Sequence, residues 1–284
     1  MSNKKQSITI RNRTFHWGKQ TYLMGILNVT PDSFSDGGEF NTIDAALAQA
    51  QHLVKAGADI IDIGGQSTRP GAEQISIIEE CDRVLPIIEA VRSVLSIPIS
   101  VDTTRASVAQ KAIAAGADIV NDISGGTFDL DMFPVVAKLG VPMVLMHIRG
   151  TPQTMQKLTD YQDLIGEIYQ FFDTQINAAV AAGIPRSHLI IDPGIGFAKT
   201  CQQNIEILQK LARFNDIGVP ILVGVSRKSF IGNILNQPAP KARVWGTAAA
   251  SCSAIASGAD ILRVHDVLEM ADVCRVADAI WRRV

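Results

Sequence analysis

Short apolar runs rich in valine and isoleucine recur along the 284-residue chain, and longer segments with apolar residues at helical spacing separate them. Such short runs are typical of strands buried on both faces, whereas helical spacing indicates helices that bury one face. The pattern predicts eight strands, at residues 22–27, 59–63, 98–101, 119–121, 142–146, 189–191, 220–224 and 261–264. It predicts eight helices, near residues 42–56, 77–95, 104–115, 129–139, 160–182, 203–214, 241–257 and 267–282, of which the segment 160–182 is the longest.

The boundaries of these units carry a repeated signature. Gly57, Gly116 and Gly258 each begin the sequence Gly-Ala-Asp-Ile, where a predicted helix ends just before a strand. Glycine is the preferred residue at such a helix end. A strand–helix unit of roughly 30 residues, repeated eight times, predicts an α/β fold, a (β/α)8 TIM barrel. A doubly wound open sheet is the alternative, but no Gly-x-Gly-x-x-Gly follows the first strand, which argues against a dinucleotide site.

The start of the chain has a different pattern. Residues 7–10 and 14–17 alternate between apolar and polar side chains around a short basic turn, which predicts a β-hairpin. We expect this hairpin, at about 7–17, to close the N-terminal end of a barrel at about 22–284. Because the repeats leave no linker, residues 1–284 are predicted to form one domain.

Composition excludes several classes of protein. Hydrophobic residues make up 47% of the chain and charged residues 19%, which suits one large globular core. A net charge of −2 gives no basis for general affinity to nucleic acid or to anionic membranes. No apolar run approaches the ~18 residues that span a bilayer, and no apolar stretch of a secretory signal follows the basic start. The four cysteines lack CxxC spacing, so we expect reduced thiols and a cytoplasmic protein.

The strand ends predict a site, because the reactive groups of a (β/α)8 barrel lie at the C-terminal ends of its strands. Each predicted strand leads to a polar side chain or cluster, namely Asn28, Gln66–Arg69, Asp102, Asn121–Asp122, His147, Asp192, Ser226–Ser229 and Arg263–Asp266. A single polar strand end is usually a helix N-cap, a role that suits Thr104, Asp122 and Asp266. Eight polar strand ends that meet at the C-terminal mouth of the barrel instead predict a site for a small polar ligand.

The segment after the first strand is polar and irregular. Pro31, Gly37 and Gly38 exclude regular structure, while Asn28 and Phe34 supply more chemistry than a connection needs. A solvated loop is the simpler interpretation, but the polar ends of the other strands favour a functional loop.

Several motifs resemble those of the dihydropteroate synthase family. They are residues 25–38, 64–71, 100–103, 121–123, 192–197, 226–229 and 263–266, and the resemblance extends from about Tyr22 to the C-terminus. It implies a pterin-binding (β/α)8 barrel that joins 6-hydroxymethyl-7,8-dihydropterin diphosphate to 4-aminobenzoate. The products are 7,8-dihydropteroate and diphosphate, and the implied cofactor is Mg2+.

The resemblance implies roles for individual residues. Asp192 and Asn121 would bind the amino-pyrimidine edge of the pterin, and Lys228 its oxo group. Asp102 would stabilise positive charge that develops on the ring as the C–O bond breaks. The implied catalytic residues are Asp102, Lys228 and Arg263. The implied pterin diphosphate site comprises Thr68, Asp102, Asn121, Met146, Asp192, Phe197, Lys228, Arg263 and His265.

Two further subsites follow from the same resemblance. Arg263 and His265 would hold the diphosphate, with Asn28 acting through Mg2+, an ion that uses few protein ligands. The pocket and loops for 4-aminobenzoate would include Phe34, Arg69, Pro70 and Ser226, together with Thr68 and Phe197. The aniline nitrogen attacks in its neutral form, so no general base is required. The proline and glycine residues of the first two loops would let them close over the site.

The chain departs from the family pattern at three places. Gln66 stands where glutamate is common, Ala198 stands where glycine is usual, and Pro238-Ala-Pro240 restricts the loop after Lys228. None of these replaces a residue that carries an implied role.

Other functions and the assembly remain open at this stage. A methyltetrahydrofolate-binding methyltransferase or a non-catalytic pterin-binding barrel would keep the pterin-binding residues without needing the diphosphate cluster. An aldolase-type metal site is disfavoured because no HExxH sequence is present. The resemblance implies a homodimer, with its interface at the last helices, where an apolar stripe is present. The alternative is that this stripe packs on the barrel. The stripe comprises Val273, Val276, Ala277, Ile280 and Trp281.

Overall fold

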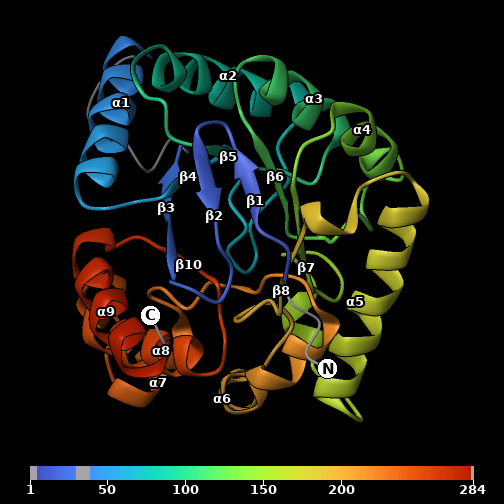
Figure 1. Cartoon of the computed structure of the whole chain (residues 1–284), viewed down its shortest axis with the longest axis vertical. Coiled ribbons are helices and arrows are strands. Elements are labelled where there is room, and N and C mark those ends of the chain that lie inside the picture. Colours follow the sequence, from blue (N-terminus) through green and yellow to red (C-terminus); the bar gives the residue numbers. More distant parts are fainter. Residues whose placement is uncertain (1–4, 30–38, 283–284) are drawn as a thin grey trace.

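The computed structural model describes residues 5–29 and 39–282, and its centre is a barrel of eight parallel strands. Their order is β8-β7-β6-β5-β4-β3-β10-β9, and a parallel bridge between Ile191 and Ile221 brings β8 beside β9 (Figure 1). The predicted (β/α)8 barrel is therefore confirmed. The strands are β3 Tyr22–Asn28, β4 Ile60–Gly64, β5 Ile99–Asp102, β6 Ile119–Asp122, β7 Met143–Met146, β8 Leu189–Asp192, β9 Leu222–Val223 and β10 Ile261–Val264.

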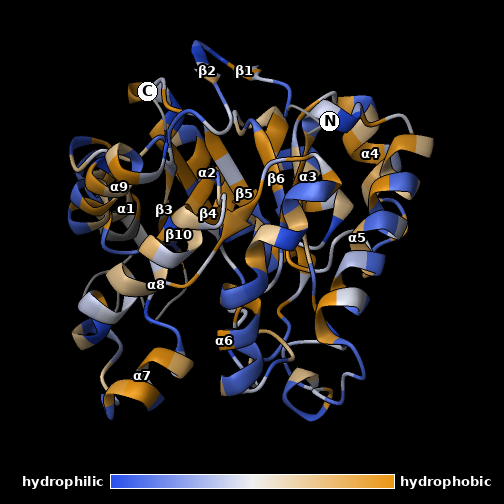
Figure 2. Cartoon of the chain, turned by 60° about the horizontal axis from the view of Figure 1, so that its bottom comes forward, coloured by the Kyte–Doolittle hydropathy of each residue, from blue (hydrophilic) through white to orange (hydrophobic). Residues whose placement is uncertain are grey.

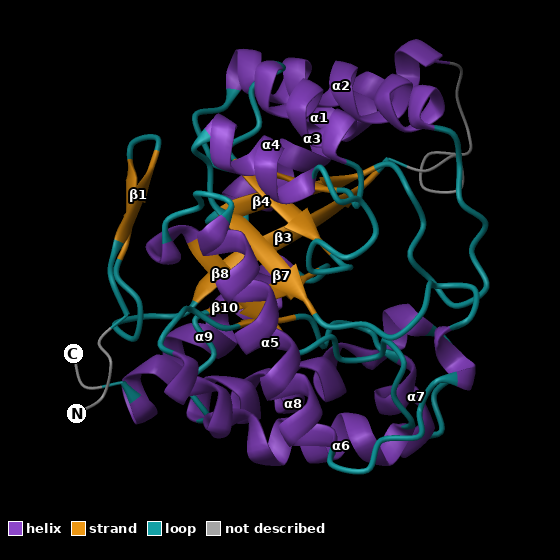
Figure 3. Ribbon diagram, turned by 90° about the vertical axis from the view of Figure 1, so that its right-hand side faces the viewer, coloured by secondary structure: helices purple, strands orange, loops and turns teal. Residues whose placement is uncertain are grey.

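Helices surround the strands in an outer layer (Figure 3). They are α1 Glu39–Lys55, α2 Ile77–Val94, α3 Ala106–Ala114, α4 Met132–Leu139, α5 Leu164–Ala181, α6 Cys201–Lys210, α7 Ser229–Leu235, α8 Val244–Ala256 and α9 Val267–Trp281. No described helix is long and apolar enough to cross a membrane.

Three sequence-based predictions about the elements were wrong. The helix predicted at 160–182 as the longest corresponds to α5, which has 18 residues and only equals α2 in length. The helix predicted at 203–214 is an α-helix only to Lys210 and continues as a 3-10 helix to Ile217. Helix α7 was not predicted, since its seven residues start directly after Lys228 and are too few to establish a helical period.

The predicted hairpin is present and covers the end of the barrel from which the strands start (Figure 3). Strand β1 (Ile8–Ile10) pairs with β2 (Arg13–Phe15) in antiparallel fashion. Phe15 is fully buried, and its ring centroid lies 5.5 Å from that of Trp17 and 4.7 Å from that of Tyr22. This apolar cluster extends to the first residues of the strands inside the barrel, so the N-terminal end is closed by a hydrophobic plug.

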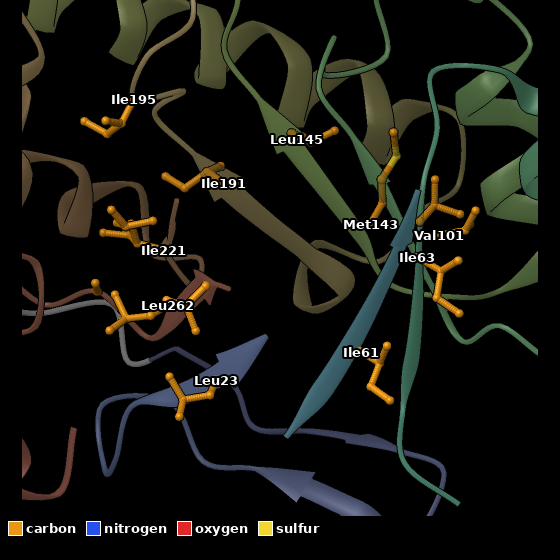
Figure 4. Close-up of a cluster of buried hydrophobic side chains, with 14 of the residues drawn as sticks. Leu23, Ile61, Ile63, Val101, Met143, Leu145, Ile191, Ile195, Ile221 and Leu262 are labelled. Carbon is orange, nitrogen blue, oxygen red and sulfur yellow. The ribbon is translucent and has the colours of Figure 1, made fainter. Parts of the chain in front are cut away.

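Alternation along the strands separates two cores. In β4, Ile61 and Ile63 face the helices, where they join the large apolar cluster shown in Figure 4. Ile60 joins the interior cluster, and Asp62 shares its side of the strand because successive side chains point to opposite faces. Figure 2 shows mainly hydrophobic strands in the centre and helices that alternate between hydrophobic and hydrophilic residues around them. The barrel interior is thus apolar near the hairpin and polar toward the other end.

The Gly-Ala-Asp-Ile repeat explains how helices join strands. Gly57, Gly116 and Gly258 have φ values of +106°, +117° and +96°, which favour glycine, as the sequence predicts. The aspartate of each repeat accepts a hydrogen bond from the backbone N–H of an adjacent strand. The three bonds run from Leu23 to Asp59 (2.7 Å), from Ile99 to Asp118 (2.9 Å) and from Ile221 to Asp260 (2.9 Å).

Candidate active site

Four polar side chains from β4, β5, β6 and β10 meet at the C-terminal end of the barrel. Arg263 donates through Nε to Asp62 (2.6 Å) and through Nη2 to Asp102 (2.8 Å). Asn121 donates through Nδ2 to the same oxygen of Asp62, at 3.1 Å. Asp62, Asp102 and Asn121 are buried, so one guanidinium balances two carboxylates away from solvent.

Burial sets the charge states in this network. It raises the pKa of Asp102 to about 7; the charge of Arg263 opposes the shift and that of Asp62 adds to it. Burial alone would lower the pKa of Arg263, but Asp62 and Asp102 outweigh that effect and raise it. Arg263 therefore stays cationic, while Asp102 changes charge near neutral pH.

Asp192 and Lys228 form a second charged group in the same mouth. Asp192 is buried, and its Oδ1 accepts a hydrogen bond from the backbone N–H of Gly194 at 2.8 Å. Burial raises the pKa of Asp192 to about 6, against the lowering effects of the Gly194 bond and of Lys228. Burial also lowers the pKa of Lys228 to about 8, helped by the positive charge of Arg263. Both groups can thus titrate near neutrality, as groups in functional sites often do.

An apolar wall accompanies these charges. Met146 at the end of β7 and Phe197 in the loop after β8 are buried in one cluster with Ile123. The Lys228 ammonium lies 4.3 Å from the centre of the Phe197 ring, a cation–π contact. Flat apolar surfaces beside hydrogen-bonding groups suit a planar heterocycle.

Ser226 and His265 contact each other. The Ser226 hydroxyl oxygen lies 3.0 Å from His265 Nδ1 and accepts the backbone N–H of His265 at 3.1 Å. Burial lowers the pKa of His265 to about 3, and the nearby Arg227 and Arg263 lower it further, so the imidazole is neutral. His265 can therefore hold an anion only by donating a ring N–H.

The second loop is held by Gln66. Its Nε2 donates to the carbonyl of Glu73 at 2.8 Å, and its Oε1 accepts the N–H of Ile75 at 2.9 Å. A glutamate could accept but not donate, so the departure at Gln66 has a structural role here. Thr68 is half-buried, while Arg69 and Pro70 are exposed at the tip.

A cavity of about 360 Å3 opens beside Asp102 and beneath this loop. Residues 66–68 of the second loop line it together with residues 102–105, Ile123 and residues 151–153. Thr68 and Asp102 are thus the predicted site residues that face this space.

Asn28 ends β3, and the strand register places it level with Gly64, which is in turn level with Asp102. In residues 5–29 and 39–282, no group of three or more His, Cys, Asp or Glu side chains could hold a metal ion. Mg2+ keeps several waters and binds phosphate oxygens readily, so a single amide oxygen from Asn28 fits an ion held mainly by a diphosphate. Phe34 lies outside the described residues.

Reasoning from the sequence missed two buried groups beside this mouth. Asp62 lies within an apolar strand run, where the alternation with Ile61 and Ile63 could have placed it inside the barrel. Lys199 follows the Asp192 loop and is 3% exposed, and no periodic pattern marks it.

The departure at Ala198 has a conformational consequence. Its φ is +49°, so an alanine occupies a left-handed backbone position between Phe197 and Lys199. This conformation costs a residue with a Cβ about 1–2 kcal/mol.

Comparisons with known proteins agree with this geometry. The model of the pterin binding enzyme family matches residues 24–265. A dihydropteroate synthase of Synechocystis sp. is 62% identical over 268 residues, which cover 94% of this chain and 93% of that protein.

Solved structures share the fold over nearly the whole chain. The Xanthomonas albilineans dihydropteroate synthase with 4-aminobenzoic acid is 40% identical, has a TM-score of 0.91 and covers 100% of both chains. The Yersinia pestis enzyme in a sulfonamide drug complex is 44% identical with a TM-score of 0.91, over 97% of this chain and 99% of that one. The chain therefore belongs to the pterin binding enzymes, and among them to the dihydropteroate synthases, which are transferases.

Proposed function

We propose that the C-terminal mouth of the barrel condenses 6-hydroxymethyl-7,8-dihydropterin diphosphate with 4-aminobenzoate. In this reaction the C–O bond to the diphosphate breaks, a C–N bond forms, and the amine releases one proton. The observation that carries the proposal is the meeting of Asp62, Asp102, Asn121 and Arg263 from four strands, beside Asp192 and Lys228. A pterin diphosphate needs acceptors for its amino edge, a cation for its leaving group and a flat apolar wall, and this mouth offers all three.

The pterin would bind between Met146 and Phe197. The second oxygen of Asp192 is not used by the Gly194 bond, so it can accept N–H groups of the amino-pyrimidine edge. Asn121 uses its Nδ2 on Asp62, which leaves its amide oxygen for the neighbouring ring N–H. Lys228 would donate to the oxo group, and this requires its protonated form.

Asp102 would act on the charge that develops during the reaction. As the diphosphate leaves, the methylene carbon and the ring gain positive charge, which a fixed carboxylate stabilises more than it stabilises the ground state. Arg263 donates to this carboxylate at 2.8 Å and so orients it.

The diphosphate would be held by Arg263 and His265. The contacts of Arg263 to Asp62 and Asp102 use Nε and Nη2, so Nη1 remains for a phosphate oxygen. Neutral His265 would donate one N–H. Mg2+, with Asn28 as its protein ligand, would supply further charge neutralisation when bound.

The second substrate would enter after the pterin, into a pocket completed by the first two loops. Thr68, Arg69 and Pro70 lie on the second loop, and Ser226 and Phe197 lie on loops at the mouth. The exposed tip of the second loop can approach a bound pterin, and Phe34 of the first loop would flank the aromatic ring. Sulfonamides would compete with 4-aminobenzoate for this pocket.

The test is an assay of diphosphate release with each substrate omitted in turn. The proposal predicts release only when the pterin diphosphate, 4-aminobenzoate and Mg2+ are all present, and loss of release in Asp102→Asn. Pterin binding without any release would favour a non-catalytic barrel. Methyl transfer from methyltetrahydrofolate would favour the methyltransferase.

We further propose that the protein is a cytoplasmic homodimer. Trp245 on α8 and Val276 and Ile280 on α9 are 77%, 63% and 64% exposed, an apolar face that a second copy would cover. Of the stripe predicted on the last helix, Val276, Ile280 and Trp281 face outward, but Ala277 is buried against the barrel. Sedimentation of the wild type and of Ile280→Glu tests this: a dimer should become a monomer. The four free cysteines support the cytoplasmic part of this proposal, because disulfides are rare in that compartment.

A further inference from the structure

Lys199 is a buried lysine to which the proposed reaction assigns no role. It is 3% exposed and closes the loop that joins β8 to α6. Its ammonium lies 2.9 Å from the carbonyl oxygen of Phe197, 3.0 Å from His147 Nδ1 and 3.5 Å from the carbonyl oxygen of His147. A buried ammonium is retained only where such acceptors satisfy its N–H groups.

His147 connects this lysine to Asp192 through a second element. It follows β7, and its backbone N–H donates to the carbonyl of Asp192 at 3.0 Å. Burial lowers the pKa of His147 to about 2, and the positive charge of Lys199 contributes, so the imidazole is neutral. An ammonium can only donate, so Nδ1 is the acceptor of its contact with Lys199. Lys199 and His147 thus join the Asp192 loop to the neighbouring strand end.

The loop needs an internal support of this kind. Gly194, Gly196 and Ala198 have positive φ values of +71°, +86° and +49°, so the backbone reverses its local turn at every second residue. A Cβ at Gly194 would stand 3.3 Å from the Lys199 ammonium, which shows that the lysine head lies inside the arch of the loop.

We propose that Lys199 is a positioning residue for pterin recognition: its ammonium fixes the loop that carries Asp192 and Phe197 and places a positive charge behind the Asp192 carboxylate. The inference rests on the proposed pterin site. Lys199 touches no substrate and acts through Asp192 and Phe197.

The charges around Lys199 support this arrangement. Burial lowers its pKa to about 7; the carboxylate of Asp192 on β8 opposes this shift, while Lys228 and Arg149 add to it. Burial raises the pKa of Asp192, and the Gly194 hydrogen bond and the charges of Lys228, Arg263 and Lys199 oppose this rise. Removing the Lys199 charge should therefore raise the pKa of Asp192, so that the carboxylate needed for binding is lost at a higher pH.

The experiment compares Lys199→Met, Lys199→Arg and Lys210→Met, the last as a control on the exposed face of α6. The dissociation constant of 6-hydroxymethylpterin is measured by calorimetry from acid to neutral pH, with thermal unfolding as a check of folding. Lys199→Met should weaken binding at neutral pH by about tenfold, as loss of a charged hydrogen-bond donor does. Its acid midpoint should move to higher pH, whereas Lys199→Arg should keep the wild-type midpoint. The KM for 4-aminobenzoate should rise less than the dissociation constant of the pterin, because Phe197 is the one residue assigned to that pocket that lies on this loop.

Each outcome decides the matter. A Lys199→Met variant with wild-type affinity or an unmoved acid midpoint would overturn the proposal, because a purely structural lysine does not set that midpoint. If Lys199→Met does not fold, His147→Gln takes its place. That change alters the acceptor at Nδ1 and keeps the charge, so affinity should fall with the midpoint unmoved, and unchanged affinity would overturn the proposal. Failure of the wild type to bind the pterin would instead refute the proposed function.

Discussion

Buried aspartates stand at both ends of the barrel, and their surroundings differ. At the N-terminal end, Asp260 accepts the backbone N–H groups of Gly18 (3.0 Å) and Ile221 (2.9 Å) and pairs with Lys5 at 2.5 Å. At the C-terminal end, Asp192 accepts one backbone N–H, and burial raises its pKa to about 6. The first carboxylate is satisfied by the fold, whereas the second keeps an oxygen for a partner outside the chain.

The same contrast holds for the other members of each set. Asp59 and Asp118 repeat the backbone contact of Asp260 and pair with arginines, at 2.7 Å and 2.6 Å. Asp62 and Asp102 instead share one arginine, and one oxygen of Asp62 is buried without a hydrogen-bond partner among the described residues. Because a buried carboxylate oxygen without a partner destabilises a fold, the one on Asp62 among these closely spaced charges indicates a ligand site.

The largest expected effect comes from removing a satisfied aspartate. Asp260→Ala leaves the Lys5 ammonium without its carboxylate and the N–H groups of Gly18 and Ile221 without their acceptor, so the free energy of unfolding should fall by about 3–5 kcal/mol. Pterin affinity per folded molecule should be unchanged. Urea unfolding measures the free energy of unfolding, and calorimetry measures the pterin affinity. A loss of affinity without a loss of stability would show that Asp260 serves binding and not the fold.

The matching change at the other end should act on binding. Asp192→Ala removes the acceptor of the amino-pyrimidine edge, so pterin affinity should fall by about 100-fold, or about 2.7 kcal/mol. Its effect on unfolding should be about 1 kcal/mol, from the single Gly194 N–H. Calorimetric titration checks the first value; affinity within a few-fold of wild type would show that the pterin is oriented differently.

The sequence could indicate the aspartates of the N-terminal end, since all three stand in one repeated motif. Of the C-terminal aspartates it indicated Asp102 and Asp192 but not Asp62. The Gly-Ala-Asp-Ile repeat marks three helix–strand junctions at the N-terminal end, although the backbone N–H groups that its aspartates accept lie 19 to 39 positions away. The pairing of Asp62 with Arg263 spans 201 positions and arises only when β10 closes against β3 and β4. No local pattern encodes such a contact, and the resemblance to a family supplied Arg263 but not Asp62. Lys199 escaped notice for the same reason, since His147 lies 52 positions away.

Arg263→Ala sharpens the comparison within the mouth. The guanidinium should bind the diphosphate more than the ring, so affinity for the pterin diphosphate should fall about tenfold further than affinity for the bare hydroxymethylpterin. Parallel titrations with the two compounds give the difference. Equal losses for both would mean that Arg263 acts only by orienting Asp102.

The pH dependence of pterin binding should be set by the titratable groups at the C-terminal end of the barrel. The pKa of Asp192 is about 6 and that of Lys228 about 8, and recognition needs the carboxylate and the ammonium. Pterin affinity should therefore rise as the pH increases through about 6 and fall as it increases from about 7 to about 8, where Lys199 and then Lys228 lose their protons. Asp192→Asn should lose the acid limb; a wild-type profile that is flat across this range would argue against both assignments.

The smallest expected effect concerns Ala198. Glycine adopts its φ of +49° without a Cβ clash, so Ala198→Gly should raise the free energy of unfolding by about 0.5–1 kcal/mol after the entropy of glycine is subtracted. Urea unfolding detects a change of this size. A decrease would show that the buried methyl group contributes more than the strain removes.

The most direct test of the central claim is a crystal structure of the protein with 6-hydroxymethylpterin bound. The ring should lie in the C-terminal mouth between Met146 and Phe197, with its amino-pyrimidine edge on Asp192 and Asn121 and its oxo group at Lys228. A pterin found elsewhere, or one whose amino edge faces away from Asp192, would contradict the account.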